Sequence, residues 1–128
     1  MMKTRKTILV AEDNKLIRNS LIDFLLNEGF SAIAAKNGAA AFMLVLEFKP
    51  DLIFSDIHMP VMNGLELLEK LKTDPCTSTI PLIFLTSDVE FLEIKAGIPK
   101  GAAGIIIKPF TFNEILRAIS IHLPDYGS

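Results

Sequence analysis

Four segments of the chain place residues that could carry out chemistry within two residues of the end of a short apolar run. These residues are the acidic pair Glu12 and Asp13, then Asp56, Thr86 and Lys108. Taken singly, each acid could equally be a solvated loop residue or a helix cap. If the fold brings the three carboxylates together, they repel one another unless a cation lies among them. Mg²⁺ suits such a site, because it takes a few carboxylates, a backbone carbonyl, waters and phosphate oxygens. With a lysine and a hydroxyl donor opposite, the set predicts in-line phosphoryl transfer to an aspartate.

The apolar runs that precede these residues predict the strands of a parallel sheet. Four of them are unbroken and one is weaker, and they cover residues 8–11, 31–36, 52–54, 82–85 and 105–107. Periodicity alone does not separate such short runs from buried helices. Their isoleucine content and the Pro, Gly or Asp residues at their ends favour strands that are covered on both faces.

Amphipathic segments lie between these strands, and each follows a residue that commonly caps a helix. The predicted caps are Asn14, Asn37, Asn63, Asp88 and Thr111. Five strands alternating with five helices predict a doubly wound α/β fold in a single domain over 1–128, with an ordered core at roughly 7–124. Binding sites in such folds lie at the carboxyl ends of the strands, where the polar residues are expected to meet.

Length and composition exclude several classes of protein. A chain of 128 residues favours one compact domain, and 13 basic against 15 acidic residues argue against direct nucleic-acid binding. Cys76 is the only cysteine, so no internal disulfide can form. The apolar run 8–11 is too short for a secretory signal or a membrane span, so a soluble, cytoplasmic protein is expected. The glycine motifs of nucleotide-binding loops are missing.

The motifs around the polar residues resemble those of response-regulator receiver domains in two-component signalling. They lie at residues 8–14, at 50–60 with Asn63-Gly64, at 85–87 and at 108–110, in the order that the family has them. The resemblance covers essentially the whole chain. It implies a flavodoxin-like fold of five strands and five helices, with the strand order 2-1-3-4-5 of a chemotaxis receiver.

The same resemblance implies a phosphoacceptor and a metal site. Asp56 matches the aspartate that takes the phosphoryl group. Asp13 matches a direct ligand of Mg²⁺, and Glu12 matches an acid that acts mostly through water. The backbone carbonyl of His58 would complete the protein ligands, so that its side chain need not take part.

Further matched positions concern the response to phosphorylation. Lys108 matches the lysine that pairs with a phosphoryl oxygen, and a cis peptide before the following proline is usual in the family. Thr86 matches the switch hydroxyl that moves towards the phosphoryl group. The side chains of His58 and Asp88 would flank the water that hydrolyses the aspartyl phosphate, and would therefore set its lifetime.

Two positions depart from the family. Ile105 stands three residues before the lysine, where receivers usually carry Tyr or Phe, so the usual aromatic readout is missing. Val61 follows Pro60 where the family often has glycine, which should strain the backbone of that loop.

The expected function is a phosphorylation-dependent signalling switch rather than an enzyme. Its expected partners are a sensor histidine kinase or a histidine phosphotransfer protein, and a downstream protein. The chain could be a stand-alone receiver or part of a larger protein. One alternative is a Mg²⁺-dependent aspartyl-phosphate phosphatase of the haloacid dehalogenase type, although His58 replaces the second aspartate that such enzymes use. Another is an interaction module that is independent of phosphate.

Overall fold

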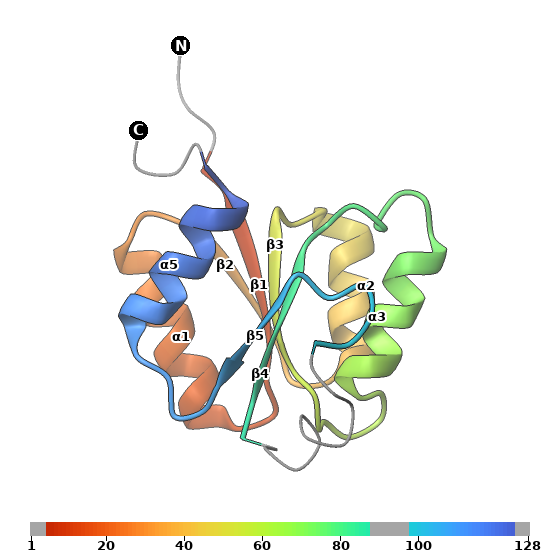
Figure 1. Ribbon diagram of the computed structural model, residues 1–128, viewed down its shortest axis with the longest axis horizontal. Helices are drawn as coiled ribbons and strands as arrows, with labels where there is room; N and C mark the ends of the chain where they lie inside the picture. Colours follow the sequence, from red (N-terminus) through yellow and green to blue (C-terminus); the bar gives the residue numbers. More distant parts are fainter. Residues whose placement is uncertain (1–4, 88–97, 125–128) are drawn as a thin grey trace.

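The computed structural model describes residues 5–87 and 98–124, which form a parallel sheet between two layers of helices (Figure 1). The strands are β1 (Thr7–Ala11), β2 (Ser31–Ala35), β3 (Leu52–Asp56), β4 (Leu82–Thr86) and β5 (Gly104–Ile107). Their order in the sheet is β2-β1-β3-β4-β5, and every neighbouring pair is parallel. The predicted flavodoxin-like α/β fold and its strand order are confirmed.

Four helices lie within the described residues. They are α1 (Lys15–Asn27), α2 (Gly38–Phe48), α3 (Gly64–Thr73) and α5 (Phe112–His122). Helices α1 and α5 cover one face of the sheet, and α2 and α3 cover the other (Figure 1). The helix predicted to begin at Asp88 falls on residues outside the described ranges, so it stays a prediction.

Each described helix begins at the polar residue that the sequence predicts. The side chain of the capping residue accepts a hydrogen bond from a backbone amide in the first turn, and the caps are Asn14, Asn37, Asn63 and Thr111. Caps of this kind each contribute about 1 kcal/mol to stability. They also fix where each loop at the carboxyl edge of the sheet must end.

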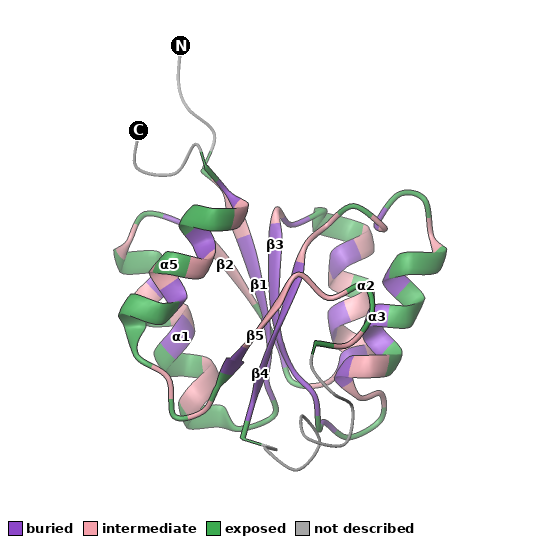
Figure 2. Cartoon of the chain, viewed as in Figure 1, coloured by how far each residue is buried: buried purple, intermediate pink, exposed green. Residues whose placement is uncertain are grey.

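The sheet separates two apolar layers, because consecutive side chains of a strand point to opposite faces. In β1, Ile8 and Val10 pack with apolar residues of α1 and α5, whereas Leu9 and Ala11 pack with those of α2 and α3. Strands β3 and β4 are buried along their whole length (Figure 2). Polar side chains therefore reach solvent only where these strands end, and that edge carries the candidate site.

Candidate functional site

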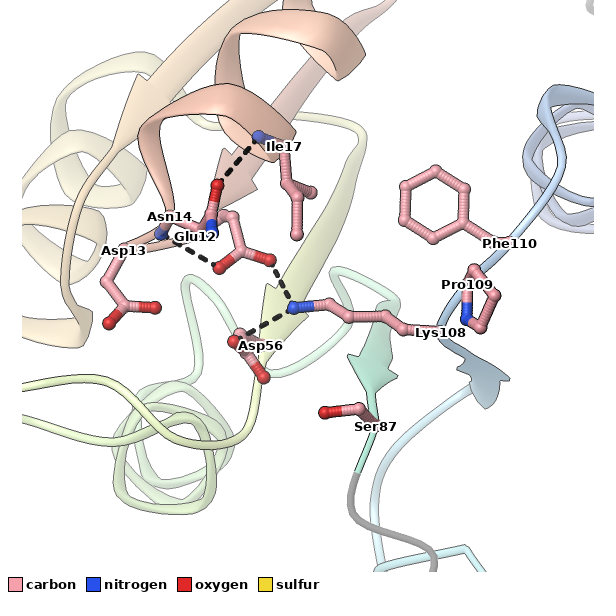
Figure 3. Close-up of a pocket in the computed structure, with 9 residues that line it drawn as sticks. All are labelled: Glu12, Asp13, Asn14, Ile17, Asp56, Ser87, Lys108, Pro109 and Phe110. Atoms are coloured by element: carbon pink, nitrogen blue, oxygen red, sulfur yellow. Dashed lines mark hydrogen bonds and ion pairs between the residues drawn. The ribbon is translucent and has the colours of Figure 1, made fainter.

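A cleft of about 690 Å³ lies at the edge of the sheet where the strands end (Figure 3). The residues that line it are Glu12, Asp13, Asn14, Ile17, Asp56, Ser87, Lys108, Pro109 and Phe110. Three of them, Ile17, Pro109 and Phe110, form an apolar wall beside the charged groups. The fold thus brings both acids after β1, the aspartate of β3 and the lysine after β5 into one place.

Asp56 is the last residue of β3, and its side chain is held from two sides. Its Oδ1 accepts a hydrogen bond of 2.7 Å from the Ile57 amide, and its Oδ2 lies 3.1 Å from the Nζ of Lys108. The residue is 9% exposed, so one edge of the carboxylate faces the cleft. On its backbone side, a Cβ on Gly64 would lie 2.1 Å from the Asp56 carbonyl oxygen. Only glycine can begin α3 this close to the end of β3.

Glu12 is completely buried, with 0% exposure, and both of its carboxylate oxygens have protein partners. Oε1 accepts a hydrogen bond of 2.5 Å from Lys108, and Oε2 accepts one of 3.1 Å from the Asn14 amide. Burial raises the pKa of Glu12, and the negative charge of Asp56 acts in the same direction. The bonds from Lys108 and Asn14 oppose that rise by stabilising the carboxylate.

Lys108 carries the positive charge of the site. Burial alone would lower its pKa, but the hydrogen bonds and negative charges of Glu12 and Asp56 together outweigh that effect. The net result is a raised pKa, so the lysine is charged at neutral pH. The peptide that joins it to Pro109 is cis, as the family resemblance implies.

The three acids form a group that fits a divalent cation. Glu12, Asp13 and Asp56 each offer a carboxylate oxygen, and these oxygens lie within 4.8 Å of one another. Oxygens on opposite sides of one Mg²⁺ are about 4 Å apart, so small side-chain rotations would bring the oxygens within its reach. Asp13 is exposed to solvent, and its role as a direct ligand stays a prediction. His58 is exposed on the neighbouring loop, and the role of its carbonyl stays a prediction.

Arg18 of α1 supports the acidic pair, and its sequence position gave no indication of this. Its Nη1 donates to the carbonyl oxygens of Glu12 at 2.8 Å and of Asp13 at 3.3 Å. The guanidinium therefore binds the backbone of the loop that carries both acids. Every residue has a backbone carbonyl, so the sequence does not show which carbonyls an arginine will bind. This role of Arg18 could therefore not be predicted from the pattern of side chains.

The residues of the chain match the family model of the response regulator receiver domain over positions 8–120. That match runs from β1 into α5 and includes every polar residue of the cleft. The chain belongs to the response regulator receiver family. Receiver domains are signalling switches of two-component systems that bind Mg²⁺ at an acidic site, and they are not generally classed as enzymes.

Relatives of this receiver occur in different protein contexts. The "Probable transcriptional regulator ycf29" of Pyropia yezoensis is 37% identical over 113 residues, which are 88% of this chain and 51% of that protein. The chain thus spans about half of that relative. The chemotaxis response regulator CheY4 of Vibrio cholerae has a TM-score of 0.84 and 27% identity, and the match covers 94% of this chain and 100% of CheY4.

A third receiver was solved with its metal. It is the receiver domain of the sensor histidine kinase PA1611 from Pseudomonas aeruginosa, whose structure holds a magnesium ion coordinated in the active site cleft. The match has a TM-score of 0.84 and covers 95% of this chain and 100% of that one. At 21% identity, this likeness shows the fold alone.

Two predictions about the whole protein stay open: that it does not bind nucleic acid directly, and where it is located in the cell. Because one relative is a transcriptional regulator about twice as long as the matched part, the expectation of no direct nucleic-acid binding is untested for a longer protein. Within residues 5–87 and 98–124, no helix is long and apolar enough to cross a membrane.

Two of the remaining predicted residues lie on β4 and β5. Thr86 ends β4 and is 1% exposed, and its carbonyl accepts a hydrogen bond of 2.8 Å from the Lys108 amide. The next residue, Ser87, lines the cleft itself, although the sequence gave it no role. Ile105 of β5 is half-buried and packs with the apolar layer under α2 and α3. Asp88 lies outside the described residues.

The loop from β3 to α3 is held by backbone contacts. The Gly64 amide donates to the Ile57 carbonyl at 2.8 Å, and the Gly38 amide of α2 donates to the Met62 carbonyl at 2.9 Å. Val61, between them, has a φ of 70° and is 84% exposed. The predicted strain after Pro60 is therefore confirmed, because a β-branched residue rarely adopts a positive φ.

Proposed function

We propose that this receiver is a signalling switch that accepts a phosphoryl group on Asp56 from a phosphohistidine. The donor would be a sensor histidine kinase or a histidine phosphotransfer protein. The observation that best supports the proposal is the place of Asp56, whose Oδ2 lies 3.1 Å from the Lys108 ammonium beside two further carboxylates. A nucleophile, a fixed cation and an acidic metal group are what in-line transfer to a carboxylate requires.

In the transfer, Oδ2 of Asp56 attacks the phosphorus while the bond from phosphorus to the donor's imidazole nitrogen breaks. The released imidazole takes up a proton from water. Oδ1 keeps its bond to the Ile57 amide, which holds the carboxylate in line. Lys108 passes its hydrogen bond from Asp56 to a phosphoryl oxygen, so its charge offsets the negative charge that arrives.

Mg²⁺ would be held by Asp13, Asp56 and the backbone carbonyl of His58, with Glu12 acting through water. When bound, the ion offsets charge on the phosphoryl oxygens and orients them. The lifetime of the aspartyl phosphate would depend on His58 and Asp88, if their side chains flank the hydrolytic water as the family resemblance implies.

The signal would pass from the phosphoryl group to Thr86 and then to β5. In this proposal, the Thr86 hydroxyl moves towards the new phosphoryl oxygens and biases an existing equilibrium between two conformations. Ile105 takes the position at which other receivers use an aromatic ring. An aliphatic side chain that packs in the apolar layer has no ring to relocate. The surface that the phosphorylated protein presents to its downstream partner would therefore differ from that of receivers with an aromatic residue at this position.

The test is to incubate the protein with Mg²⁺ and acetyl phosphate and to measure its intact mass, with Asp56→Asn as the control. We expect one phosphoryl group on the wild type, labile to base and missing from the variant. Removal of Mg²⁺ by a chelator should prevent the modification.

Two other results would each replace the proposal. Repeated turnover of a generic phosphomonoester such as p-nitrophenyl phosphate would indicate a Mg²⁺-dependent phosphatase. No adduct with acetyl phosphate, together with no binding of beryllofluoride, would indicate an interaction module that works without phosphate.

A further inference from the structure

Strand β2 lies at one end of the sheet and carries none of the features that usually keep such an edge from pairing. Within residues 5–87 and 98–124, no strand lies on its outer side. Its residues, Ser31–Ala35, include no charged side chain and no proline, and they form an unbroken ladder with β1. Exposed sheet edges are commonly protected by lysines, prolines or bulges, because their backbone groups pair readily with another strand. An edge without such protection is suited to pairing.

The backbone of β2 points alternately toward β1 and toward the open edge. The Ser31 amide donates to the Lys6 carbonyl beside β1 at 2.9 Å. In a parallel ladder, residues with such bonds alternate with residues whose N–H and C=O groups face the other side. Both Ala32 and Ala34 therefore direct their backbone donors and acceptors outward. The side chains of these two residues are small, so a second backbone can approach them closely.

One helix that packs on β2 presents apolar side chains beside this edge. The Lys70 ammonium of α3 lies 4.8 Å from the centre of the Phe42 ring of α2, so α3 lies on that side of α2 (Figure 1). Helical spacing places Leu44 and Phe48 on the other side of α2, toward the open edge of β2. Phe48 is 53% exposed, and Glu47 is the only charged residue of this helix.

Helix α1 has the same arrangement on the other face of the sheet. The Phe24 ring stacks on that of Phe112 in α5, with ring centres 4.1 Å apart, so α5 lies on that side of α1. Helical spacing places Ile22 and Leu26 on the opposite side, and Leu26 is 49% exposed. A specific interface buries about 800 Å² on each partner, and a strand this short cannot supply that area alone. The apolar side chains on both faces enlarge the surface around β2.

We propose that the edge of β2 is an interface at which two copies of this chain pair antiparallel and join their sheets. In the register that sets Ile33 opposite its own copy, Ala32 of each strand lies opposite Ala34 of the other. Each such pair can exchange both of its backbone hydrogen bonds across a two-fold axis. A register shifted by two residues would pair one of the alanines with a residue outside β2, so the symmetric register at Ile33 is favoured.

A second copy fits this edge because the surface is complementary to itself. The two-fold axis at the middle of β2 directs Ile22 and Leu44, near the middle of their helices, toward their own copies. Lys36, which is exposed just beyond β2, would lie opposite Phe30 of the second copy, beside the turn that contains Glu28. Symmetry repeats this arrangement at the other end of the strand pair. Opposite charges therefore flank an apolar centre, which favours this pairing over a shifted one.

The first experiment measures the oligomeric state of the wild type by sedimentation equilibrium, up to the limit of its solubility, and compares it with Ala34→Pro. Proline removes the outward N–H of residue 34, and an edge strand tolerates it where that N–H faces solvent. We expect the wild type to dimerise. The dimer dissociation constant of Ala34→Pro should be roughly tenfold higher or more, since each copy loses a hydrogen bond. Ala34→Ser, which keeps the N–H, is the matched control and should dimerise as the wild type does.

Cysteine cross-linking tests the register and does not depend on how well the proline variant folds. The background is Cys76→Ser, which removes the exposed native cysteine. Ile33→Cys would place two thiols opposite each other, with Cα atoms about 4.5 Å apart, which is within the range of a disulfide. Ala34→Cys is the control, because its two copies would lie two positions out of register, more than about 7 Å apart. We expect copper phenanthroline to cross-link the first variant and not the second.

The proposal is wrong if the wild type stays monomeric, a result that would leave the edge to an extended segment of another protein. It is also wrong if folded Ala34→Pro dimerises as well as the wild type, or if Ala34→Cys cross-links as fast as Ile33→Cys. Either result would show that a different face joins the two copies. Circular dichroism shows whether Ala34→Pro is folded, and the cross-linking rates decide the question if it is not.

Discussion

Two loops meet at the carboxyl edge of the sheet, and they are held in place by different means. The loop from β1 to α1 depends on polar side chains, since Arg18 binds its carbonyls and the Asn14 side chain caps the helix that follows. The loop from β3 to α3 depends on its backbone and on two glycines, Gly38 and Gly64, which allow close approach.

The difference teaches which kind of substitution each loop should resist. A side-chain hydrogen bond contributes a modest net free energy, so the first loop should change gradually as partners are removed. A methyl group placed against a backbone atom cannot be relieved by rotation, so the second loop should fail abruptly when volume is added. Both loops carry residues of the proposed phosphorylation site. Removing hydrogen bonds from the first loop and adding volume to the second should therefore both slow the acceptance of phosphate.

The largest effect is expected from Gly64→Ala. Its new Cβ would lie 2.1 Å from the Asp56 carbonyl oxygen and 2.9 Å from the Phe84 ring, so α3 would have to move away from β3. We expect the free energy of unfolding to fall by about 3 kcal/mol or more, measured by urea denaturation. The phosphoacceptor would move with its carbonyl, so acceptance of phosphate should be lost even where the fold persists.

Gly104→Ala is the matched control for that substitution. At the start of β5, a new Cβ would lie 3.9 Å from Ile83, which is ordinary contact. The free energy of unfolding of this variant should lie within about 0.5 kcal/mol of that of the wild type. Equal stability of the two alanine variants would contradict the idea that close approach at Gly64 fixes the loop.

Gly38→Ala should cause a smaller loss. Its Cβ would meet the Met62 carbonyl oxygen at 2.5 Å, but that oxygen lies in a loop that also contains the exposed Val61 and can shift outward. Alanine also favours helix over glycine at the start of α2. The net loss should be about 1–2 kcal/mol. A shift of the loop should also weaken Mg²⁺ binding, so a variant with unchanged stability and metal affinity would show that this contact is dispensable.

The parts of the fold that the sequence predicts well are those with local causes. The caps at Asn14, Asn37, Asn63 and Thr111 all begin helices, because a capping side chain needs only the amides two or three residues ahead. Strands β1, β3 and β4 likewise follow from runs of residues that are buried on both faces, whereas β2 and β5 are partly exposed. The strand order came from the family resemblance, since alternation alone does not determine which strands are neighbours.

The parts of the site that the sequence missed depend on distant partners. Arg18 and the Gly38 amide donate hydrogen bonds to backbone carbonyls of other segments. Ser87 lines the cleft because it directly follows the last residue of β4. The Glu12 contact with Lys108 joins the first and last strands in chain order. The sequence placed both residues at one site, but it did not indicate that their side chains are bonded to each other.

Arg18→Met tests the loop that depends on side chains. The variant keeps most of the apolar stem and loses the bonds to the Glu12 and Asp13 carbonyls, so we expect a loss of about 1 kcal/mol in the free energy of unfolding. The amide NMR signals of residues 12–14 should shift, while those of the loop after β3 stay in place. Arg18→Lys should recover part of the loss, since one ammonium can still reach a carbonyl. Equal shifts in both loops would mean that the two are supported as one unit.

Val61→Gly has the smallest expected effect, and it should be a gain. A left-handed conformation costs an ordinary residue roughly 1–2 kcal/mol, and Val61 adopts it at a φ of 70°. Glycine removes that cost, but it also increases the conformational freedom of the unfolded chain, so the net gain should be about 0.5 kcal/mol. Val61→Ala, which keeps the Cβ, should gain less. Because the side chain is 84% exposed, little packing is lost in either variant. A less stable glycine variant would show that the loop after β3 depends on the Val61 side chain as well as on its backbone, and the contrast between the two loops would then fail at this position.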